Sequence, residues 1–355
     1  MSVPFWKPPS ESYPGLLPDR ADVLVIGGGI AGTSLMHHLA KRRFSAVLVE
    51  RHHLAAGASG RNAGFLLAGV ADCYAEAVRI FGREKAREVW HTTNENHDRM
   101  LEAVERDDVG HRRLGSMTLA SGDEERARLE ESGQLLRDDG FEARWDGRGL
   151  LNPRDGEVNP AALVGALARR SRAGAILEGV EVTAIEPAGT EVTVRAGERE
   201  CRAGAVILAT NAYTPLLLPQ VKIQPTRAQM LASAPISRSV CDMPTYSHFG
   251  YRYWRQLPSG EVLIGGWRDT ALADEISSDD EPTPQIQEHL DRRLAEMTAG
   301  SQATHRWAGI MGFTESGLPL VGPVDGVRNV YTCAGFNGHG MGFAFMSAKQ
   351  LVESL

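Results

Sequence analysis

One stretch near the N-terminus constrains the fold more than any other. The apolar run Val23–Ile26 predicts a buried strand, and it leads directly into Gly27, Gly29 and Gly32, which are spaced as G-x-G-x-x-G before a predicted helix over 31–40. Between a strand and a helix, the first glycine permits a tight turn and the second lets a pyrophosphate approach the backbone. The third lets the helix pack close to the strand. The phosphates of a dinucleotide then lie at the helix N-terminus.

The next strand supplies the second part of this pattern. Ala46–Val49 is apolar and ends on Glu50, which comes 18 residues after Gly32. In dinucleotide-binding folds a carboxylate about 20 residues on accepts hydrogen bonds from the ribose hydroxyls. After Arg51, the loop 57–64 is rich in glycine and small residues, which allow a backbone to approach a ligand closely. A plain surface loop is the alternative, but its place directly after the ribose acceptor favours a ligand.

Composition limits the class of protein. The 355 residues are 42% hydrophobic and 23% charged, as in ordinary globular chains of roughly two domains. The net charge of −7 argues against nucleic acid or an anionic membrane as the main partner. No apolar run approaches the ~18 residues that span a bilayer. The first twenty residues contain five prolines and no apolar signal-peptide core, so we expect an extended surface arm.

Cysteines and histidines give no sign of a disulfide framework or a metal site. The four cysteines are far apart and form no C-x-x-C, which fits a reducing, cytoplasmic location. His37 and His38 are neighbours on the first predicted helix, so their side chains leave in different directions and do not form one ligand set. We expect no metal. We also expect His97, on the apolar stripe of a later helix, to be a packed core residue.

The remaining pattern alternates helices with strands. Helices are predicted over 75–105, from a capping box at Ser121–Glu124, from Asn159 to near Gly174, and, polar and exposed, over 284–297. The predicted strands are 114–120, 175–185, 191–194, 198–202, 205–211, 221–233, 250–257, 261–266 and 329–333. The buried strand 205–211 is expected beside the first strand. The strands over 221–266 are expected to form a separate antiparallel sheet.

A second strand–glycine–helix unit closes the chain. The strand 329–333 leads into A-G-F-N-G-H-G-M-G, residues 334–342, and a C-terminal helix. This helix N-terminus offers oriented N–H groups to another electron-rich group. His339 in the turn has two open interpretations, a proton relay or a structural residue that holds the loop.

Four separated motifs together resemble the D-amino-acid-oxidase-like superfamily of FAD enzymes, which includes glycine, sarcosine and gamma-glutamylputrescine oxidases. They are G-G-G-I-A-G with Glu50, the loop G-A-S-G-R-N-A-G, the strand end A-T-N-A-Y, and the pair G-L-P-L-V-G and G-F-N-G-H-G. The resemblance runs from Asp22 to Leu355. The loop and the strand end look closest to the gamma-glutamylputrescine oxidase branch.

The resemblance implies an α/β (α+β) fold with a discontinuous Rossmann-like FAD-binding domain and an antiparallel-sheet substrate domain. The first would contain residues 21–75, 155–215 and 305–355, after an N-terminal arm over 1–20. The second would contain 76–154 and 216–304. The long gap before the strand at 205 independently disfavours a compact nicotinamide-binding domain.

The resemblance also implies positions that bind the FAD non-covalently. The adenosine half would contact Gly27, Gly29, Ile30, Ala31, Gly32, Glu50, Arg51 and Val182. The flavin would contact Ser59, Gly60, Arg61, Asn62 and Gly64, and the second turn at Gly335, Asn337, Gly338, His339, Gly340 and Met341. The strand end Ala209, Thr210 and Asn211 would also bind the FAD.

Three positions depart from the family pattern. Relatives of the glycine-oxidase type carry an arginine for the substrate carboxylate after a W-A-G-like stretch, where this chain has Met311. A lysine of sarcosine-oxidase-type members is replaced by Gly342, and their flavin-linking cysteine by Gly309. Because an unpaired buried carboxylate is costly, these changes favour an amine without a carboxylate on the reacting carbon.

Strand alternation places Tyr251, Tyr253 and Arg255 on one face of the predicted sheet. They are candidate pocket residues, and a solvated face with a cation–π pair is the alternative. The implied reaction is oxidation of a small amine by hydride transfer to the flavin, with His339, Tyr253, Arg255 and Met311 as candidate catalytic-site residues. Oxygen, giving hydrogen peroxide, or another acceptor would reoxidise the flavin. A dehydrogenase and a non-catalytic flavin-binding subunit are the alternatives.

Overall fold

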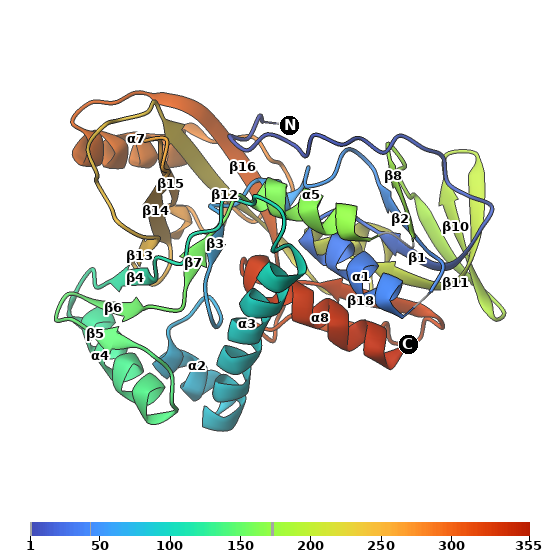
Figure 1. Cartoon of the computed structure of the whole chain (residues 1–355), viewed down its shortest axis with the longest axis horizontal. Coiled ribbons are helices and arrows are strands. Elements are labelled where there is room, and N and C mark those ends of the chain that lie inside the picture. The colour runs from blue at the N-terminus through green and yellow to red at the C-terminus, as the bar shows by residue number, and fades with distance from the viewer. Residues whose placement is uncertain (1, 43, 172–173) are drawn as a thin grey trace.

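The computed structural model describes residues 2–42, 44–171 and 174–355. Two eight-stranded sheets form its two ends, and long helices lie between them (Figure 1). The expected mixed α/β fold with a second, largely antiparallel sheet is confirmed. Within the described ranges, no helix is both long and apolar enough to cross a membrane.

The first sheet grows around the strand that precedes the glycine turn. Its order is β17-β18-β11-β1-β2-β8, with β9 and β10 continuing from β11 as a ribbon. Strand β1 has parallel neighbours on both sides, Val23 lying opposite Ala205 and Ala46. A strand covered on both faces needs a continuous apolar run, which Val23–Ile26 supplies. The strands are β1 (Arg20–Ile26), β2 (Ala46–Glu50), β8 (Gly174–Glu178), β9 (Ala184–Ala188), β10 (Glu191–Ala196), β11 (Arg199–Leu208), β17 (Leu320–Pro323) and β18 (Val330–Ala334).

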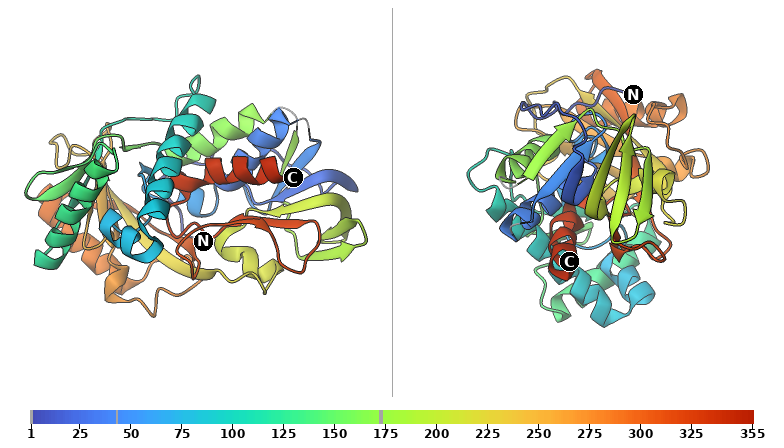
Figure 2. Two further views of the ribbon diagram at one scale, coloured as in Figure 1. Left: turned by 90° about the horizontal axis from the view of Figure 1, so that it is seen from below. Right: turned by 90° about the vertical axis from the view of Figure 1, so that its right-hand side faces the viewer.

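Four helices form the layer that covers this sheet and extends toward the second one. Helix α8 packs against α1 and α3, and α1 also packs against α5 (Figure 2, left). Helix α5 begins as predicted, because the Asn159 side chain accepts hydrogen bonds from two N–H groups of its first turn. The helices are α1 (Ile30–Lys41), α3 (Arg83–Ala103), α5 (Pro160–Arg170) and α8 (Gly340–Ser354).

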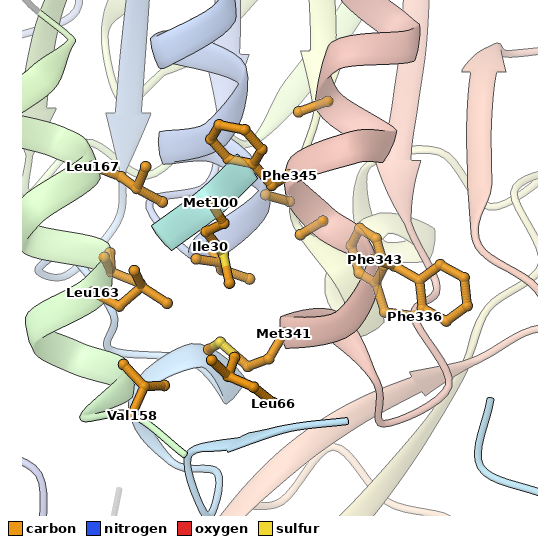
Figure 3. Packing of buried hydrophobic residues seen from close by; sticks show 14 of the residues in the cluster. Ile30, Leu66, Met100, Val158, Leu163, Leu167, Phe336, Met341, Phe343 and Phe345 are labelled. Atoms are coloured by element: carbon orange, nitrogen blue, oxygen red, sulfur yellow. The ribbon is translucent and has the colours of Figure 1, made fainter. Parts of the chain in front are cut away.

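The apolar core joins these helices to the two glycine turns. Figure 3 shows Ile30 of α1, Met100 of α3 and Phe345 of α8 converging between the helices, with Leu163 and Leu167 of α5 beside them. Met100 and Leu163 are fully buried. Because Ile30 and Met341 lie in the first turns of the helices that follow the two glycine turns, the same packing fixes both helix N-termini.

The second sheet has the order β16-β12-β15-β14-β13-β4-β6-β5 and is antiparallel except for the pair β13–β4. Helix α7 (Pro284–Thr298) covers β12 and β15, and α4 (Asp123–Asp138) packs near β5 and β6. The strands are β4 (Ser116–Leu119), β5 (Arg144–Trp145), β6 (Gly149–Asn152), β12 (Gln224–Ser233), β13 (Thr245–Ser247), β14 (Arg252–Gln256), β15 (Val262–Gly266) and β16 (Ala303–Phe313). A two-stranded pair, β3 (Phe65–Leu66) with β7 (Gly156–Glu157), lies between the sheets.

Several sequence predictions were wrong at the level of elements. The helix expected over 75–105 is broken into α2 (Tyr74–Phe81) and α3 by Gly82, whose φ of 82° is left-handed. The strand expected over 175–185 is split into β8 and β9. Helix α7 is not simply exposed, because Ile286, Leu290 and Leu294 bury one face against the sheet. Period-based reasoning could not find these breaks because the flanking residues suit either structure.

Two further differences concern a helix start and the N-terminal arm. At α4 the carboxylate that returns to the Ser121 N–H belongs to Glu125 rather than Glu124. The arm is partly buried rather than laid on the surface: Trp6 is 6% exposed and donates a hydrogen bond to the carbonyl of Asn62. The arm therefore supports the loop that was predicted to contact a ligand.

Candidate functional site

A continuous cavity of about 570 Å³ extends from the glycine turn after β1 to an inner chamber between the second sheet and helices α2 and α4. That volume is in the usual range of small-molecule sites. It reaches the C-terminal ends of β1, β2 and β11, where ligands bind in open α/β sheets. The predicted residues on its wall are Gly27, Gly29, Ile30, Ala31, Glu50, Arg51, Ser59, Arg61, Asn62, Val182, Ala209, Thr210, Asn211, Tyr253, Met311, Asn337, Gly338, His339, Gly340 and Met341.

The first glycine turn has the close packing that its motif requires. Gly27 has a φ of +113°, which side chains rarely adopt. A Cβ on Gly32 would lie 1.9 Å from the Gly27 carbonyl oxygen, and one on Gly29 would lie 2.8 Å from Ser59 Oγ. Gly32 itself is not on the cavity wall; it allows α1 to approach β1, and the N-terminus of α1 then faces the cavity.

Glu50 ends β2 beside that turn. Its Oε2 accepts a hydrogen bond from the Gly28 N–H at 2.7 Å, and its Oε1 accepts one from the His52 N–H at 2.9 Å. Each carboxylate oxygen can accept a further bond, so the group can hold the turn and still meet two hydroxyls. Arg51 lies over the Tyr213 ring, 4.4 Å from its centroid, and Val182 and Val180 complete an apolar wall.

The loop after β2 forms a short 3-10 turn (Ala58–Gly60) that is held by its own polar groups. Asn62 Oδ1 accepts from the Gly64 N–H, while its Nδ2 donates to the carbonyls of Ala58 and Ser59. Ser59 Oγ accepts from the Ile30 N–H at 2.9 Å, which joins the loop to the start of α1. These bonds fix the backbone of the loop against the cavity.

Three residues of this loop that were predicted to bind the cofactor, Gly60, Arg61 and Gly64, pack against or bind protein groups beneath the loop. Gly60 and Gly64 are not on the wall; a Cβ would lie 2.3 Å from the Ala55 carbonyl in the first case and 2.2 Å from the Val158 carbonyl in the second. Arg61 reaches the wall, but its guanidinium is directed to protein groups. It donates to the carbonyls of Ala56 and Ala308, each at 2.8 Å.

Asn211, shortly after the end of β11, connects that strand to the second glycine turn. Its Oδ1 accepts a hydrogen bond from the Gly335 N–H at 3.0 Å, and its φ of 45° is left-handed. Gly335 lies behind the wall, since a Cβ there would meet Thr314 at 2.4 Å. Asn337, with a φ of 51°, accepts from the Thr314 N–H through Oδ1 at 2.9 Å. The turn therefore presents its backbone to the cavity in one fixed arrangement.

His339 immediately precedes α8 and lines the cavity. Burial lowers the pKa of its imidazole, so the ring stays neutral at pH 7. Its Nδ1 lies 3.4 Å from the Asn337 carbonyl oxygen. Met311, on β16, has its sulfur 3.2 Å from the place a Cβ on Gly338 would take, so it packs against the same turn.

Arg255 does not reach the cavity. It is 3% exposed, and its Nε lies 3.2 Å from Oε2 of the buried Glu157. Its Nη1 donates to the carbonyls of Ala63, Gly64 and Val158. The guanidinium therefore supports the loop from behind, and the expectation that Arg255 belongs to the reaction site is corrected. Burial lowers its pKa to about 10.

The inner chamber contains residues that sequence reasoning missed. Tyr253 is on its wall as predicted, and burial raises the pKa of this phenol to about 12. Tyr246, Phe65 and Asp155 also line the cavity but come from other elements, so no local spacing relates them to Tyr253. Arg268 also lines the cavity, with its guanidinium over the rings of Tyr251 and Phe313, 4.5 and 5.1 Å from their centroids. In the described residues we find no group of three or more His, Cys, Asp or Glu that could hold a metal ion.

Comparison with known proteins identifies the family. The model of the DAO family, FAD-dependent oxidoreductases, matches residues 22–354. This chain belongs to that family. Its expected cofactor, FAD, and its oxidoreductase class are confirmed.

The relatives agree with this assignment over nearly the whole chain. The probable oxidoreductase OrdL of Rhizobium meliloti (strain 1021) is 27% identical over 94% of this chain and 82% of its own. Gamma-glutamylputrescine oxidoreductase of Escherichia coli K12 is 25% identical over 94% and 83%. The crystal structure of glycine oxidase from Geobacillus kaustophilus superposes with a TM-score of 0.79 at 21% identity, covering 95% of each chain.

The residues present fit FAD. The left-handed Gly27, the N-terminus of α1 and the Glu50 carboxylate would form a cradle for the pyrophosphate and a ribose. The loop at Ser59 and Asn62 and the second turn at Gly338–Met341 would hold the flavin, next to the aromatic inner chamber.

Proposed function

We propose that this DAO-family oxidoreductase oxidises the C–N bond of a small amine and uses oxygen as its electron acceptor. When bound, the FAD supplies the redox chemistry by accepting hydride from the amine carbon; the resulting imine is hydrolysed, and oxygen is reduced to hydrogen peroxide. The protein's task is then to bind a neutral amine, orient its C–H bond and exclude water. We propose non-covalent binding of FAD, since Gly309 occupies the usual attachment position.

Met311 supports an amine without a carboxylate on the reacting carbon. It is a neutral, flexible side chain at the wall position where relatives of the glycine-oxidase type carry a carboxylate-binding arginine. A carboxylate buried there without a cation would be costly.

Three arginines that could otherwise replace the missing one form ion pairs or hydrogen bonds with other protein groups. Arg255 is paired with Glu157, and Arg227 with the buried Glu275 at 2.9 Å. Arg61 donates to backbone carbonyls and lies 3.4 Å from Asp280. Arg268 also lines the cavity and lies over the rings of Tyr251 and Phe313, where it suits a remote anionic group better than one on the reacting carbon.

His339 has a positioning role in this proposal. Its neutral ring and the N–H groups at the start of α8 face the cavity at the second turn. An uncharged imidazole can donate or accept one hydrogen bond there without adding charge. The N-terminus of α8 favours negative charge on the group it faces. We keep the proton-relay role of His339 as the alternative.

The division into two domains is also part of the proposal, with one changed boundary. Strand β16 pairs with β12 along its length, so residues 303–313 belong with the substrate sheet rather than with 305–355. We also propose a cytoplasmic location, supported by the four free cysteines, and no nucleic-acid partner, supported by the net negative charge.

The test compares amines with their α-carboxylated analogues by the rate of flavin reduction, with peroxide measured under air. We expect the uncarboxylated member to react faster in several pairs, peroxide to form in step with turnover, and acid precipitation to release intact FAD. Faster reaction of the carboxylated members would contradict the substrate proposal. Flavin reduction without peroxide would favour the alternative that the protein is a dehydrogenase. If no amine reduced the flavin, the alternative of a non-catalytic flavin-binding subunit would be favoured.

A further inference from the structure

The inner chamber contains a buried carboxyl group that the proposed reaction does not use. Asp155 lies between β6 and β7, is 2% exposed and lines the cavity. Its Oδ1 accepts a hydrogen bond from the Ala68 N–H at 3.0 Å, and its Oδ2 accepts one from Ser116 Oγ at 2.6 Å. Both donors are neutral, and each carboxyl oxygen retains capacity for another hydrogen bond.

Asp155 has no cationic partner in the part of the chain that the structure describes. The arginines that influence it from a distance, Arg113 and Arg154, form ion pairs with Asp98 at 2.7 and 2.5 Å. Buried carboxylates are as a rule paired with a cation, because an isolated buried charge is costly. Burial raises the pKa of Asp155 to about 7, the response expected of a carboxyl without such a partner.

Aromatic rings surround the same chamber. The Phe65 ring centroid is 5.3 Å from that of Tyr246 and 6.2 Å from that of Tyr253, and the two tyrosines are 5.5 Å apart. All three line the cavity. In the described ranges neither tyrosine hydroxyl makes a hydrogen bond to the protein. Aromatic faces beside a carboxylate form a favourable environment for an ammonium group.

The nitrogen at the reacting carbon must be neutral, because its lone pair assists loss of the hydride. A carboxylate that stabilises the charged form is therefore unsuited to the reacting nitrogen and suited to a second one. We propose that the substrate carries a second, non-reacting ammonium group, which Asp155 binds between Tyr246 and Tyr253. The substrate class is then a diamine or longer oligoamine. This inference rests on the proposed amine oxidation.

The test compares straight-chain monoamines with α,ω-diamines of equal length in the purified holoenzyme. We expect the wild type to prefer the diamine by about tenfold or more in kcat/KM, and Asp155→Asn to abolish that preference by raising the diamine KM with kcat nearly unchanged. A hydrogen bond between charged groups corresponds to a factor of that order. Asparagine keeps the size of the side chain and can still accept from Ala68.

A control and a second measurement separate this role from a structural one. Asp107→Asn removes a partly buried carboxylate that pairs with Arg169 and Arg170 away from the cavity, and it should leave the preference intact. Calorimetry with anaerobic, dithionite-reduced enzyme measures diamine binding without turnover. There Asp155→Asn, and separately Tyr246→Leu, should weaken binding.

The outcomes distinguish the two proposals. The second-ammonium proposal would be overturned if the enzyme oxidised monoamines as well as diamines. It would also be overturned if both the diamine preference and diamine binding survived the Asp155 and Tyr246 substitutions. Either result would leave the proposed amine oxidation in place. Failure of every amine to reduce the flavin would overturn both.

Discussion

Glu50 combines two tasks at the residue scale. It holds the glycine turn through the Gly28 N–H, and we propose that it also accepts hydrogen bonds from the ribose hydroxyls of the cofactor. Bonds to a charged acceptor contribute more than neutral ones, so Glu50→Ala should weaken FAD binding by roughly 2–3 kcal/mol, about 30- to 150-fold in Kd. Glu50→Gln, which retains one acceptor oxygen, should lose less. The Kd of FAD for the apoprotein gives the answer, and unchanged affinity in the alanine variant would exclude Glu50 as the ribose ligand.

Glu157 tests the corrected role of Arg255. Glu157 is 1% exposed and pairs with Arg112 and Arg255. Breaking a buried ion pair leaves an uncompensated charge, so Glu157→Gln should reduce the free energy of unfolding by roughly 3–5 kcal/mol. Denaturant unfolding measures this. A variant with normal stability but altered kinetics for substrate would instead support a direct role for Arg255.

Residue types alone could not separate these arginines. Arg61 and Arg255 follow or occupy predicted strands and are candidate ligand residues by sequence, and Arg227 lies on another predicted strand. Their partners Ala308, Glu275 and Glu157 are far away in sequence, so only the fold shows that they are committed. The sequence did not suggest Asp155 as a site residue, because it precedes a glycine as an ordinary turn residue does. Its burial depends on Ala68 and Ser116, which are far away in sequence.

At the element scale, α1 must approach β1 closely for the cofactor cradle to form. A Cβ on Gly32 would lie 1.9 Å from a backbone oxygen that cannot move without distorting the turn. Gly32→Ala should therefore lower the free energy of unfolding by about 3 kcal/mol or more and prevent retention of FAD. Gly122→Ala is the control, because no atom lies within 4 Å of that Cβ and its φ is −172°. It should cost about 1 kcal/mol at most. Normal flavin content in Gly32→Ala would refute this reading of the motif.

Elements with a strong local pattern were the predictable ones. The strand–glycine–helix units at each end of the chain and the Asn159 helix start carry their own turn and cap residues, so sequence placed them within about three residues. The break at Gly82 interrupts a helical pattern that continues on both sides, and the second-sheet position of β16 depends on its long-range ladder with β12.

At the scale of the whole molecule, buried neutral histidines make stability depend on pH. His97, on α3 against α8, is 3% exposed, has no hydrogen-bond partner among the described residues, and burial lowers its pKa to about 3. The unfolded chain binds this proton near pH 6.5, so stability is fully present above that value and falls as the pH drops toward 3.

The expected loss is up to roughly 2 kcal/mol from His97 alone at pH 5. His97→Leu should flatten the fall of Tm between pH 7 and 5, whereas His91→Gln, an exposed residue of the same helix, should not. Equal acid sensitivity of the wild type and the His97 variant would show that His97 does not govern it.

The central claim, that this FAD enzyme oxidises an amine in the chamber beside the second glycine turn, is tested most directly by an anaerobic titration. Purified protein is mixed with a panel of amines without oxygen, and the absorbance of oxidised flavin is followed. We predict that at least one amine without an α-carboxylate removes this absorbance, with one equivalent of amine consumed per FAD, and that admitting air restores it. Flavin that stays oxidised with every amine while dithionite still reduces it would contradict the account.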